Sequence, residues 1–356
     1  MTTVSSEIKI TRTEASRLSQ VDFENIPFGK IFSDHMLVAD FDKGAWQTPE
    51  IRPFGAFQVK PSTTALHYGQ SIFEGMKAYR TVAGKAVLFR PRDNFARMNR
   101  SAERMVMPVI PESIFLDGMK ELIRLDAGWI PKKEGSSLYI RPLMYANDDY
   151  IGVKPSDSYR FVIFTCPVGQ YYSEPVKLWV TRKYVRAAEG GTGEAKTAGN
   201  YAASYYAARQ AQDRGYHNVM WLDGKEHRFV EECGTMNVFF VIDGVVVTPS
   251  LGGTILRGIT RESVLTLLRD RNVRAEERRI SFEEIGEAHA KGKLQECFGA
   301  GTAATISPVS QIGSEEGVLH LPPDEERKIG PALLKELNDI RLGRVEDRHG
   351  WMEDIG

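Results

Sequence analysis

Residues 190–204 read GGTGEAKTAGNYAAS, a glycine-rich loop that holds one lysine and runs into helix-forming residues. Glycines allow the backbone to approach a bound ligand closely. The lysine, Lys196, can act as a nucleophilic amine only where burial or nearby cations favour its uncharged form. A lysine in such a loop is more often a solvated charge, so this stretch alone does not establish a reactive amine.

The composition is that of a soluble globular protein with more than one domain. Its 356 residues exceed the usual length of a single domain, and 42% hydrophobic with 26% charged residues is typical of globular proteins. The 46 basic and 47 acidic residues are interspersed, so no extended field of one sign would attract nucleic acid or an anionic membrane. No apolar run suits a membrane span. We therefore expect small-molecule partners, no nucleic acid and no membrane.

The cysteines and the N-terminal residues favour a cytoplasmic location. Cys166, Cys233 and Cys297 are odd in number and widely spaced, which fits neither a disulfide framework nor a zinc site. We expect buried thiols in a reducing compartment, and no metal site. Residues 1–20 lack the continuous apolar core of a secretory signal.

Hydrophobic periodicity predicts a mixture of helices and strands. Asp243-Gly244, between two apolar runs, predicts a tight hairpin, and Thr260 is expected to cap the helix that follows it. The charged residues after 341 are expected to be loosely held. The predicted helices are 92–107, 111–127, 200–214, 261–270 and 326–341, and the predicted strands include 138–144, 159–166, 176–181, 236–242 and 245–248.

A turn-rich stretch divides the chain. Residues 167–175 read PVGQYYSEP, whose prolines and glycine are typical of a connector. We expect a smaller α/β domain over 1–166, a connector over 167–176, and a larger domain over 177–356 that carries the lysine. The fold class is α/β, with helices and strands mixed (α+β).

The lysine stretch and six further blocks resemble, in the same order, the branched-chain amino acid aminotransferases, which are pyridoxal-phosphate (PLP) enzymes of fold-type IV. Agreement of several ordered blocks is more specific than any single motif. The resemblance implies the two-domain fold of that family. The further blocks are LHYGQSIFEGMKAYR (66–80), LFRPRDNFARMNRSAERM (88–105), YIRPLMY (139–145), EECGTMNVFFV (231–241), ILRGITRES (255–263) and FGAGTAATISPV (298–309).

The resemblance implies which side chains hold the ring of PLP. Lys196 would form the Schiff base with the cofactor aldehyde and later move a proton at the substrate Cα. Glu232 matches the family glutamate that pairs with the pyridine nitrogen, and its neighbour Glu231 is the alternative. Tyr201 matches the tyrosine that donates to the phenolic oxygen of the cofactor.

The cofactor phosphate is expected where a helix begins. Backbone N–H groups at a helix start, together with the positive end of the helix dipole, bind anions. The resemblance assigns this role to Gly258, Ile259 and Thr260.

Two further residues are assigned to the phosphate by resemblance, Arg97 and Thr302. Arginine suits this task because its guanidinium can donate two parallel hydrogen bonds to a phosphate. The helix predicted around Arg97 also carries Arg92, Arg100 and Arg104, so its pattern alone does not single out one arginine.

The substrate pocket has to accept an apolar side chain in one half-reaction and glutamate in the other. The resemblance implies aromatic walls, with Arg141 and tyrosine hydroxyls meeting the second carboxylate of glutamate or 2-oxoglutarate. Thr302 and Ala303 would meet the substrate carboxylate. The walls would be Tyr68, which is expected to reach across a subunit interface, Phe73, Tyr139 and Tyr171.

The implied reaction is a ping-pong transamination between L-leucine, L-isoleucine or L-valine and 2-oxoglutarate. D-amino acid aminotransferases and aminodeoxychorismate lyases share the fold, so the fold alone leaves these reactions open. A catalytically silent PLP- or partner-binding protein is the alternative of another class. The blocks around Tyr68, Arg141 and Thr302 follow the branched-chain pattern, and a homodimer is expected because active sites in this family include residues of a neighbouring subunit.

Overall fold

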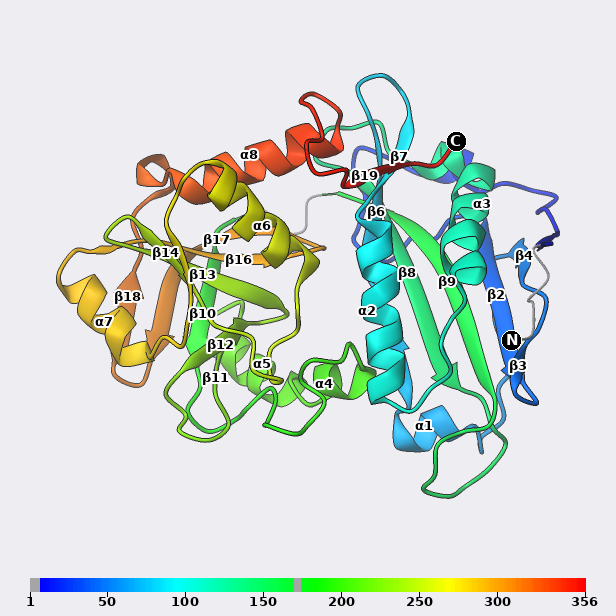
Figure 1. Ribbon diagram of the computed structural model, residues 1–356, viewed down its shortest axis with the longest axis horizontal. Helices are drawn as coiled ribbons and strands as arrows, with labels where there is room; N and C mark the ends of the chain where they lie inside the picture. Colours follow the sequence, from blue (N-terminus) through cyan, green and yellow to red (C-terminus); the bar gives the residue numbers. More distant parts are fainter. Residues whose placement is uncertain (1–6, 170–173) are drawn as a thin grey trace. The chain divides into compact units, whose positions relative to one another are not determined.

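Two large β-sheets, each with its own buried core, organise the chain (Figure 1). The computed structural model describes residues 7–169 and 174–356. By their internal contacts, the residues divide into a first unit of Met1–Tyr171, Ala195–Gly199 and Asp339–Gly356, and a second unit of Tyr172–Glu194 and Asn200–Asn338.

This division differs from the single boundary expected at 167–176. The lysine segment Ala195–Gly199 and the C-terminal residues belong to the first unit because both hydrogen-bond to its strands. The first unit therefore holds the greater share of the chain, whereas the sequence suggested a smaller first domain. Residues 170–173 of the predicted connector lie outside the described residues.

The sheet of the first unit is mostly antiparallel and packs against helices α2 (Pro91–Arg104) and α3 (Gly118–Leu125), which lie over one of its faces in Figure 1. A short helix, α1 (Thr64–Tyr68), precedes its central strands. The strand order is β1 (Lys9–Ile10), β4 (Glu50–Pro53), β2 (His35–Asp42), β9 (Tyr159–Val168), β8 (Ser137–Ala146), β6 (Met76–Arg80), β7 (Ala86–Phe89) and β19 (Met352–Asp354), with β3 (Ala45–Trp46) beside β2 and β5 (Ser71–Phe73) beside β8.

The alternation of side chains along β8 gives this sheet two different faces. Leu138 and Ile140 belong to the core that the helices cover. Because successive side chains of a strand point to opposite faces, Tyr139 and Arg141 project from the other face. The predicted substrate residues of β8 therefore lie on the face away from α2 and α3.

Part of the sheet of the second unit closes into a ring, because β12 pairs with both β11 and β13, while β14, β15 and β18 lie outside this ring. The strand order is β12 (Val230–Cys233), β11 (Asn218–Leu222), β10 (Val176–Val180), β17 (Thr305–Ser314), β16 (Leu294–Gly301), β13 (Met236–Ile242), β14 (Val245–Thr248) and β15 (Ala275–Glu277), with β18 (Gly317–His320) beside β17. The helices of this part of the chain are α4 (Ala198–Ala202), α5 (Tyr205–Asp213), α6 (Ile259–Asp270), α7 (Phe282–Ala290) and α8 (Ile329–Arg341), of which α4 and α8 each contain residues of both units.

The hairpin predicted at Asp243-Gly244 is confirmed. Ile242 pairs with Val245, and the two residues between them have φ values of 51° and 78°. Two positive φ values in a two-residue loop are what a type I′ turn requires. The strands predicted over 138–144, 159–166 and 176–181 are likewise present as β8, β9 and β10.

Two predicted helices are interrupted. Residues 111–127 form a π-helical turn at Ser113–Asp117 before α3 begins at Gly118, where a Cβ would press on the side chain of Leu37. The helix predicted over 200–214 is split into α4 and α5. At the break, the Ser204 hydroxyl donates to the Tyr201 carbonyl at 2.6 Å, a side-chain contact that competes with the helical backbone pattern.

Two local expectations are wrong. Thr260 does not cap α6, because the helix already begins at Ile259, the residue before it. Gly258 occupies the cap position, and α6 has no side-chain cap. The residues after 341 are not loosely held along their whole length, because β19 pairs with β7 and adds an edge strand to the first sheet. Backbone pairing with a distant strand leaves no local sequence signal.

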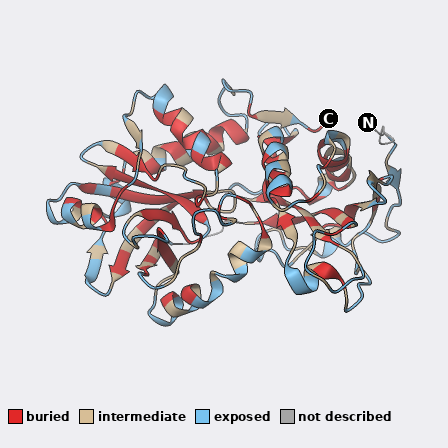
Figure 2. Ribbon diagram, turned by 60° about the horizontal axis from the view of Figure 1, so that its bottom comes forward, coloured by how far each residue is buried: buried red, intermediate tan, exposed pale blue. Residues whose placement is uncertain are grey.

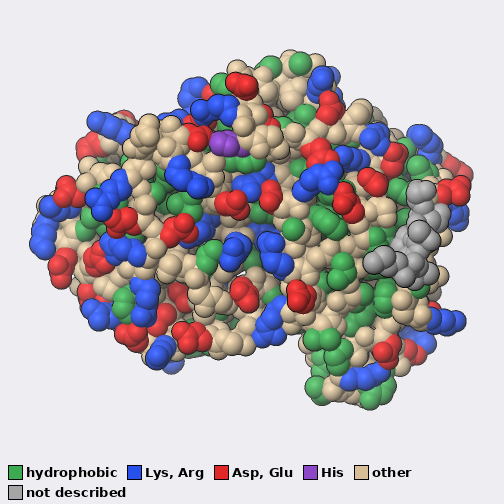
Figure 3. Space-filling model, viewed as in Figure 1, with side chains coloured by type: hydrophobic (Ala, Val, Ile, Leu, Met, Phe, Trp, Pro, Cys, Tyr) green, Lys and Arg blue, Asp and Glu red, His purple; other side chains and the backbone are tan. Residues whose placement is uncertain are grey.

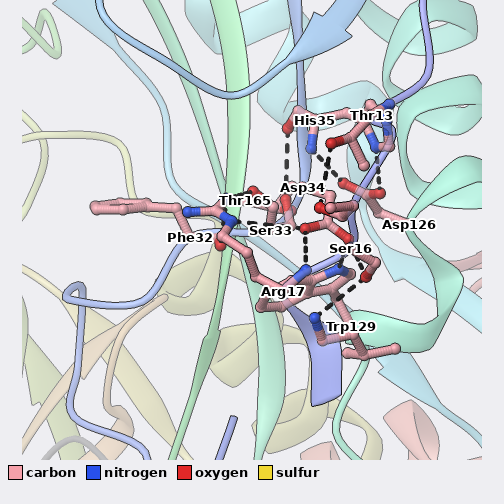
Figure 4. Close-up of polar contacts among 12 residues, drawn as sticks. Thr13, Ser16, Arg17, Phe32, Ser33, Asp34, His35, Asp126, Trp129 and Thr165 are labelled. Atoms are coloured by element: carbon pink, nitrogen blue, oxygen red, sulfur yellow. Dashed lines mark hydrogen bonds and ion pairs between the residues drawn. The ribbon is translucent and has the colours of Figure 1, made fainter. Parts of the chain in front are cut away.

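Buried polar contacts fasten the segment before β2 to the first unit (Figure 4). His35 donates from Nδ1 to Asp126 at 2.7 Å and accepts the Thr13 backbone N–H at Nε2, so both ring nitrogens are used. Asp34 accepts hydrogen bonds from the Trp129 indole and the Arg17 backbone N–H. Burial alone would raise the pKa of Asp34, but these donors and the Ser16 hydroxyl hold it below its ordinary value.

Burial is concentrated in the strands, while exposed positions lie on the outer faces of the helices and on the loops (Figure 2). The three cysteines are buried and free, as expected. In the described part of the chain, none of the helices has the length and apolar character needed to cross a bilayer.

Candidate active site

Lys196 is fastened to the first unit through its backbone. Its N–H donates to the Ser101 hydroxyl on α2 at 3.0 Å, and its carbonyl accepts the Phe73 N–H at 3.0 Å. The next residue, Thr197, donates its hydroxyl to the Ser71 carbonyl at 2.8 Å. The glycine-rich stretch thus carries its lysine to the end of β5, which a solvated surface loop would not do.

Two cations lie over the ring of Phe73. The Lys196 Nζ is 4.8 Å from the ring centre and the Arg141 guanidinium carbon is 4.7 Å from it. Arg141 also donates from Nη2 to the Tyr139 hydroxyl at 3.1 Å. Cations within about 6 Å of a ring centre are attracted to it. The predicted lysine and three of the predicted substrate residues are therefore brought together.

Arg97 is the arginine of α2 that turns inward. It is 5% exposed, whereas Arg92, Arg100 and Arg104 are exposed. Its Nε lies 2.7 Å from Oε1 of Glu74, and its Nη2 lies 2.7 Å from Oε2. Glu74 is fully buried. Burial therefore singles out the arginine that the helix pattern alone did not.

Glu74 is held as a carboxylate among positive groups. Burial alone would raise the pKa of Glu74, but the charge and hydrogen bonds of Arg97 lower it, with further contributions from the charge of Lys196 and a hydrogen bond from Asn94. The first unit thus places a half-buried lysine and a buried arginine around one buried counter-charge.

Glu74, Asn94 and Ser101 were not predicted as site residues. One signal was present: Asn94, Arg97 and Ser101 recur at spacings of three and four on α2, and all are buried. A polar stripe at helical spacing is unusual on a buried face, where side chains are mostly apolar. Glu74 stands between apolar neighbours in SIFEGM and carries no comparable pattern.

Two of the predicted aromatic wall residues are not joined to this group by a described contact. Tyr68 ends α1 and is 43% exposed. Tyr171 lies outside the described residues.

In the second unit, Glu232 on β12 faces a cation. Its Oε2 lies 2.9 Å from the Nε of Arg186, and both side chains are buried. Its Oε1 accepts the Leu256 N–H at 2.8 Å. Arg186 was not predicted as a site residue, and no spacing in the sequence marks it.

The neighbouring Glu231 has a different environment. Burial raises the pKa of Glu231, and the Thr254 hydroxyl that donates to it only partly offsets this effect. Since burial raises the pKa of Glu231 while Glu232 faces a guanidinium, Glu232 is the carboxylate better suited to hold a positively charged ring N–H.

The loop that leads into α6 is braced from β13. Asn237 donates from Nδ2 to the Leu256 carbonyl at 3.0 Å, and its Oδ1 packs so closely on Gly258 that any Cβ there would collide with it. The first turn of α6 thus starts from a fixed position, with Ile259 and Thr260 both buried. Backbone N–H groups at a helix start suit an anion.

Thr302 and Ala303 lie in the turn between β16 and β17. The turn closes at the pair Gly301–Thr305, and Thr305 has a φ of 64°, an unusual conformation for a β-branched residue. Such strain is found disproportionately where a backbone is held for function. Tyr201, five residues after Lys196, lies in α4 and is grouped with the second unit.

The chemistry of this donor set fits PLP. The cofactor needs an amine for its aldehyde, an acid for its ring nitrogen, a donor for its phenolic oxygen and an anion site for its phosphate. Lys196, Glu232, Tyr201, Arg97 and the start of α6 offer these groups in turn.

Comparisons with known proteins agree with this chemistry. The amino-transferase class IV family matches residues 71–312. Branched-chain-amino-acid transaminase 1 of Bacillus subtilis (strain 168) is 44% identical over 339 residues, which cover 94% of this chain and 95% of that protein.

Solved structures give the same result. A branched-chain aminotransferase from Thermoproteus uzoniensis with norvaline has a TM-score of 0.75 at 28% identity, covering 90% of this chain and 100% of that chain. A T.th. branched-chain amino acid aminotransferase complexed with N-(5'-phosphopyridoxyl)-L-glutamate has a TM-score of 0.70 at 26% identity, covering 89% and 98%. The chain therefore belongs to the amino-transferase class IV family, as a branched-chain-amino-acid aminotransferase of fold-type IV.

Proposed function

We propose that this aminotransferase exchanges the amino group between L-leucine, L-isoleucine or L-valine and 2-oxoglutarate, giving the branched-chain 2-oxo acids and L-glutamate in a ping-pong reaction. The observation that carries the proposal is the group around Phe73, where Lys196 and Arg141 lie over one aromatic ring. An amine and a carboxylate-binding cation beside an apolar surface match the two kinds of substrate.

PLP is the proposed cofactor, in line with the family and with the phosphopyridoxyl complex of the T.th. enzyme. When bound, PLP supplies an aldehyde that takes up the amino group and a ring that accommodates the electron pair released at the substrate Cα. Lys196 would hold the aldehyde covalently through Nζ and, once released, accept the Cα proton at that atom.

The other proposed cofactor contacts divide by chemistry. Glu232 would accept the ring N–H, and Tyr201 would donate to the phenolic oxygen. The phosphate would be held by the anion-binding groups Arg97, Gly258, Ile259, Thr260 and Thr302.

The proposed substrate residues would distinguish amino acids by the side chains of those substrates. Phe73 and Tyr139, with Tyr68 and Tyr171, would offer apolar surface to leucine, isoleucine and valine. Arg141 would pair with the second carboxylate of glutamate, since a guanidinium binds a carboxylate through two parallel hydrogen bonds. The carboxylate common to all substrates would be met at Thr302 and Ala303.

A homodimer is part of the proposal. Hydrophobic side chains gather at the lower right of Figure 3, over α1 and the loop that follows β8. These two segments are joined by backbone hydrogen bonds, and their exposed apolar residues include Leu66, Tyr68, Tyr150, Ile151 and Val153. Such contiguous apolar surface is usual at subunit interfaces. Elsewhere on this face, charges of both signs are interspersed.

The proposed place of action is the cytoplasm. The three buried, free thiols support this, because disulfides are rare in a reducing compartment.

The test is turnover of the PLP-loaded enzyme with L-leucine and 2-oxoglutarate. Formation of L-glutamate with L-leucine but not with D-alanine is expected, and absence of L-leucine turnover would refute the substrate assignment. Borohydride reduction should attach the cofactor to the peptide that contains Lys196. A Lys196→Ala protein with full activity would refute the assignment of the lysine.

A further inference from the structure

Arg186 joins three parts of the second unit at one point. Its guanidinium pairs with Glu232 at 2.9 Å, and its Nη2 donates to the carbonyls of Gly193 and Thr254. The side chains of Arg186 and Glu232 are only 9% and 5% exposed. Gly193 and Thr254 approach so closely that a Cβ on Gly193 would collide with the Thr254 backbone. The arginine is therefore a buried charge with defined partners.

A buried cation beside a carboxylate affects whether that carboxylate or its hydrogen-bond partner holds the proton between them. When a carboxylate faces a pyridine nitrogen, one proton can reside on the oxygen or on the nitrogen. A guanidinium at the far side of the carboxylate favours its ionised form, and this effect is stronger in a buried site than in water. The proton then resides on the nitrogen.

We propose that Arg186 is a positioning residue that keeps Glu232 ionised and oriented, so that the ring nitrogen of PLP carries the proton. The inference rests on the proposed function, in which Glu232 meets that nitrogen. A carboxylate has about four lone-pair sites, so Glu232 can accept a ring N–H while Leu256 and Arg186 hold it.

The contacts explain why the cation is an arginine. The planar guanidinium lets Nη2 donate to two carbonyls while Nε lies in an ion pair with the Glu232 carboxylate. A lysine would supply the same charge on a compact ammonium group, which lacks the planar arrangement of N–H donors. Arg186 thereby links the charge state of Glu232 to the position of the loop that leads from Thr254 into α6.

The experiment uses the holoenzyme loaded with PLP that is isotope-labelled at the ring nitrogen. Nitrogen NMR reports whether this atom is protonated, and the choice of variants separates loss of the charge from loss of the loop brace. Arg186→Gln removes the charge but keeps an amide that can donate to the carbonyls, and Arg186→Lys keeps the charge. Arg186→Met, which fills a similar volume, is the second charge-free variant should the glutamine protein not fold. Glu232→Gln is the reference for loss of the carboxylate.

We expect a protonated ring nitrogen in the wild type and in Arg186→Lys, and loss of protonation in Arg186→Gln or Arg186→Met. The rate of amino transfer from L-leucine should fall on the order of 10- to 100-fold in the charge-free variants, as is common when an outer contact of a ligand-binding residue is removed. A charge-free variant whose ring nitrogen stays protonated at neutral pH overturns the inference. If Glu232→Gln also leaves the nitrogen protonated, the proposed role of Glu232 itself fails, so the two failures are distinguishable.

Discussion

Glu74 and Arg97 form a buried two-point ion pair, with Nε–Oε1 and Nη2–Oε2 distances of 2.7 Å each. Removing one partner of such a pair leaves the other charge buried and uncompensated, which costs about 3–5 kcal/mol. Glu74→Gln should lower the free energy of unfolding by this amount, as measured by urea denaturation. Glu112→Gln is the matched control, because its pair with Arg92 is more than half exposed and should contribute little to stability.

The same pair predicts an effect on the part of cofactor binding that comes from the phosphate, and not on the part that comes from the ring. If Glu74 aims Arg97 at the phosphate, Glu74→Gln should weaken the binding of PLP at least tenfold (about 1.4 kcal/mol) and leave the binding of pyridoxal, which has no phosphate, nearly unchanged. Fluorescence titration of the apoenzyme measures both. Equal losses for the two ligands would show that Glu74 acts on the fold as a whole.

Asp223 predicts a loss of stability in acid. Burial alone would raise its pKa, but four backbone N–H groups, those of Glu226, Arg228, Phe229 and Lys225, lower the pKa to about 2 from an ordinary value of 3.8. A lowered pKa stabilises the fold above the unfolded value, and this contribution is lost as the pH falls from about 4 to about 2.

Asp223→Asn should therefore cost about 2 kcal/mol at neutral pH, and the difference from wild type should shrink below pH 4. Unfolding titrations at several pH values measure this. The control is Asp213→Asn, whose carboxylate is 58% exposed in a pair with Arg209. A difference that stays constant down to pH 2 would contradict the prediction.

Glu296 caps α8 from a distant strand. Its Oε1 accepts the N–H groups of Lys328 and Ile329 at 2.7 Å, and its Oε2 accepts that of Gly330 at 2.8 Å. Hydrogen bonds to a charged group contribute about 1.5–3 kcal/mol each, so Glu296→Ala should cost at least about 3 kcal/mol.

Glu296→Gln should be milder, because its amide oxygen can still accept two of the three N–H groups. Amide hydrogen exchange at the start of α8 should rise in the order wild type, glutamine, alanine. Glu287→Gln, whose side chain is 71% exposed, should leave the exchange unchanged. Equal exchange in all variants would mean that α8 is held by its apolar face alone.

Arg141→Met tests the proposed two-substrate pocket. Loss of the guanidinium should raise KM for 2-oxoglutarate at least about 30-fold, since truncating one partner of a buried charge pair costs about 2 kcal/mol or more. KM for L-leucine, which has no second carboxylate, should change little. The matched control is Arg160→Met, because Arg160 also lies over a phenylalanine ring, that of Phe57, but pairs with Asp40. Parallel increases for both substrates would refute the assignment.

Local patterns predicted those features that depend on local chemistry. Asp243-Gly244 specified a turn because both residues tolerate positive φ. The strand-like runs at 138–144 and 159–166 were sufficient to place β8 and β9. The family resemblance, in turn, rested on several ordered blocks and was confirmed by the comparisons.

Features that depend on contacts between distant residues were not predictable from local patterns. The grouping of Lys196 with the first unit depends on hydrogen bonds to Ser101 and Phe73, both of which are far away in the sequence. Arg186 became recognisable only when β12 placed Glu232 beside it. The roles assigned to the individual site residues stay predictions for the experiments above.

The pairing of β19 with β7 affects when the first sheet can be completed during synthesis. The ribosome makes β7 long before β19, so the edge of β7 that faces away from β6 has to wait for its partner while the second unit emerges. An unpaired strand edge on a growing chain can attract other strands. Nascent chains that stall before Met352 should therefore engage chaperones longer than chains that already include β19, because their first sheet still lacks this edge strand.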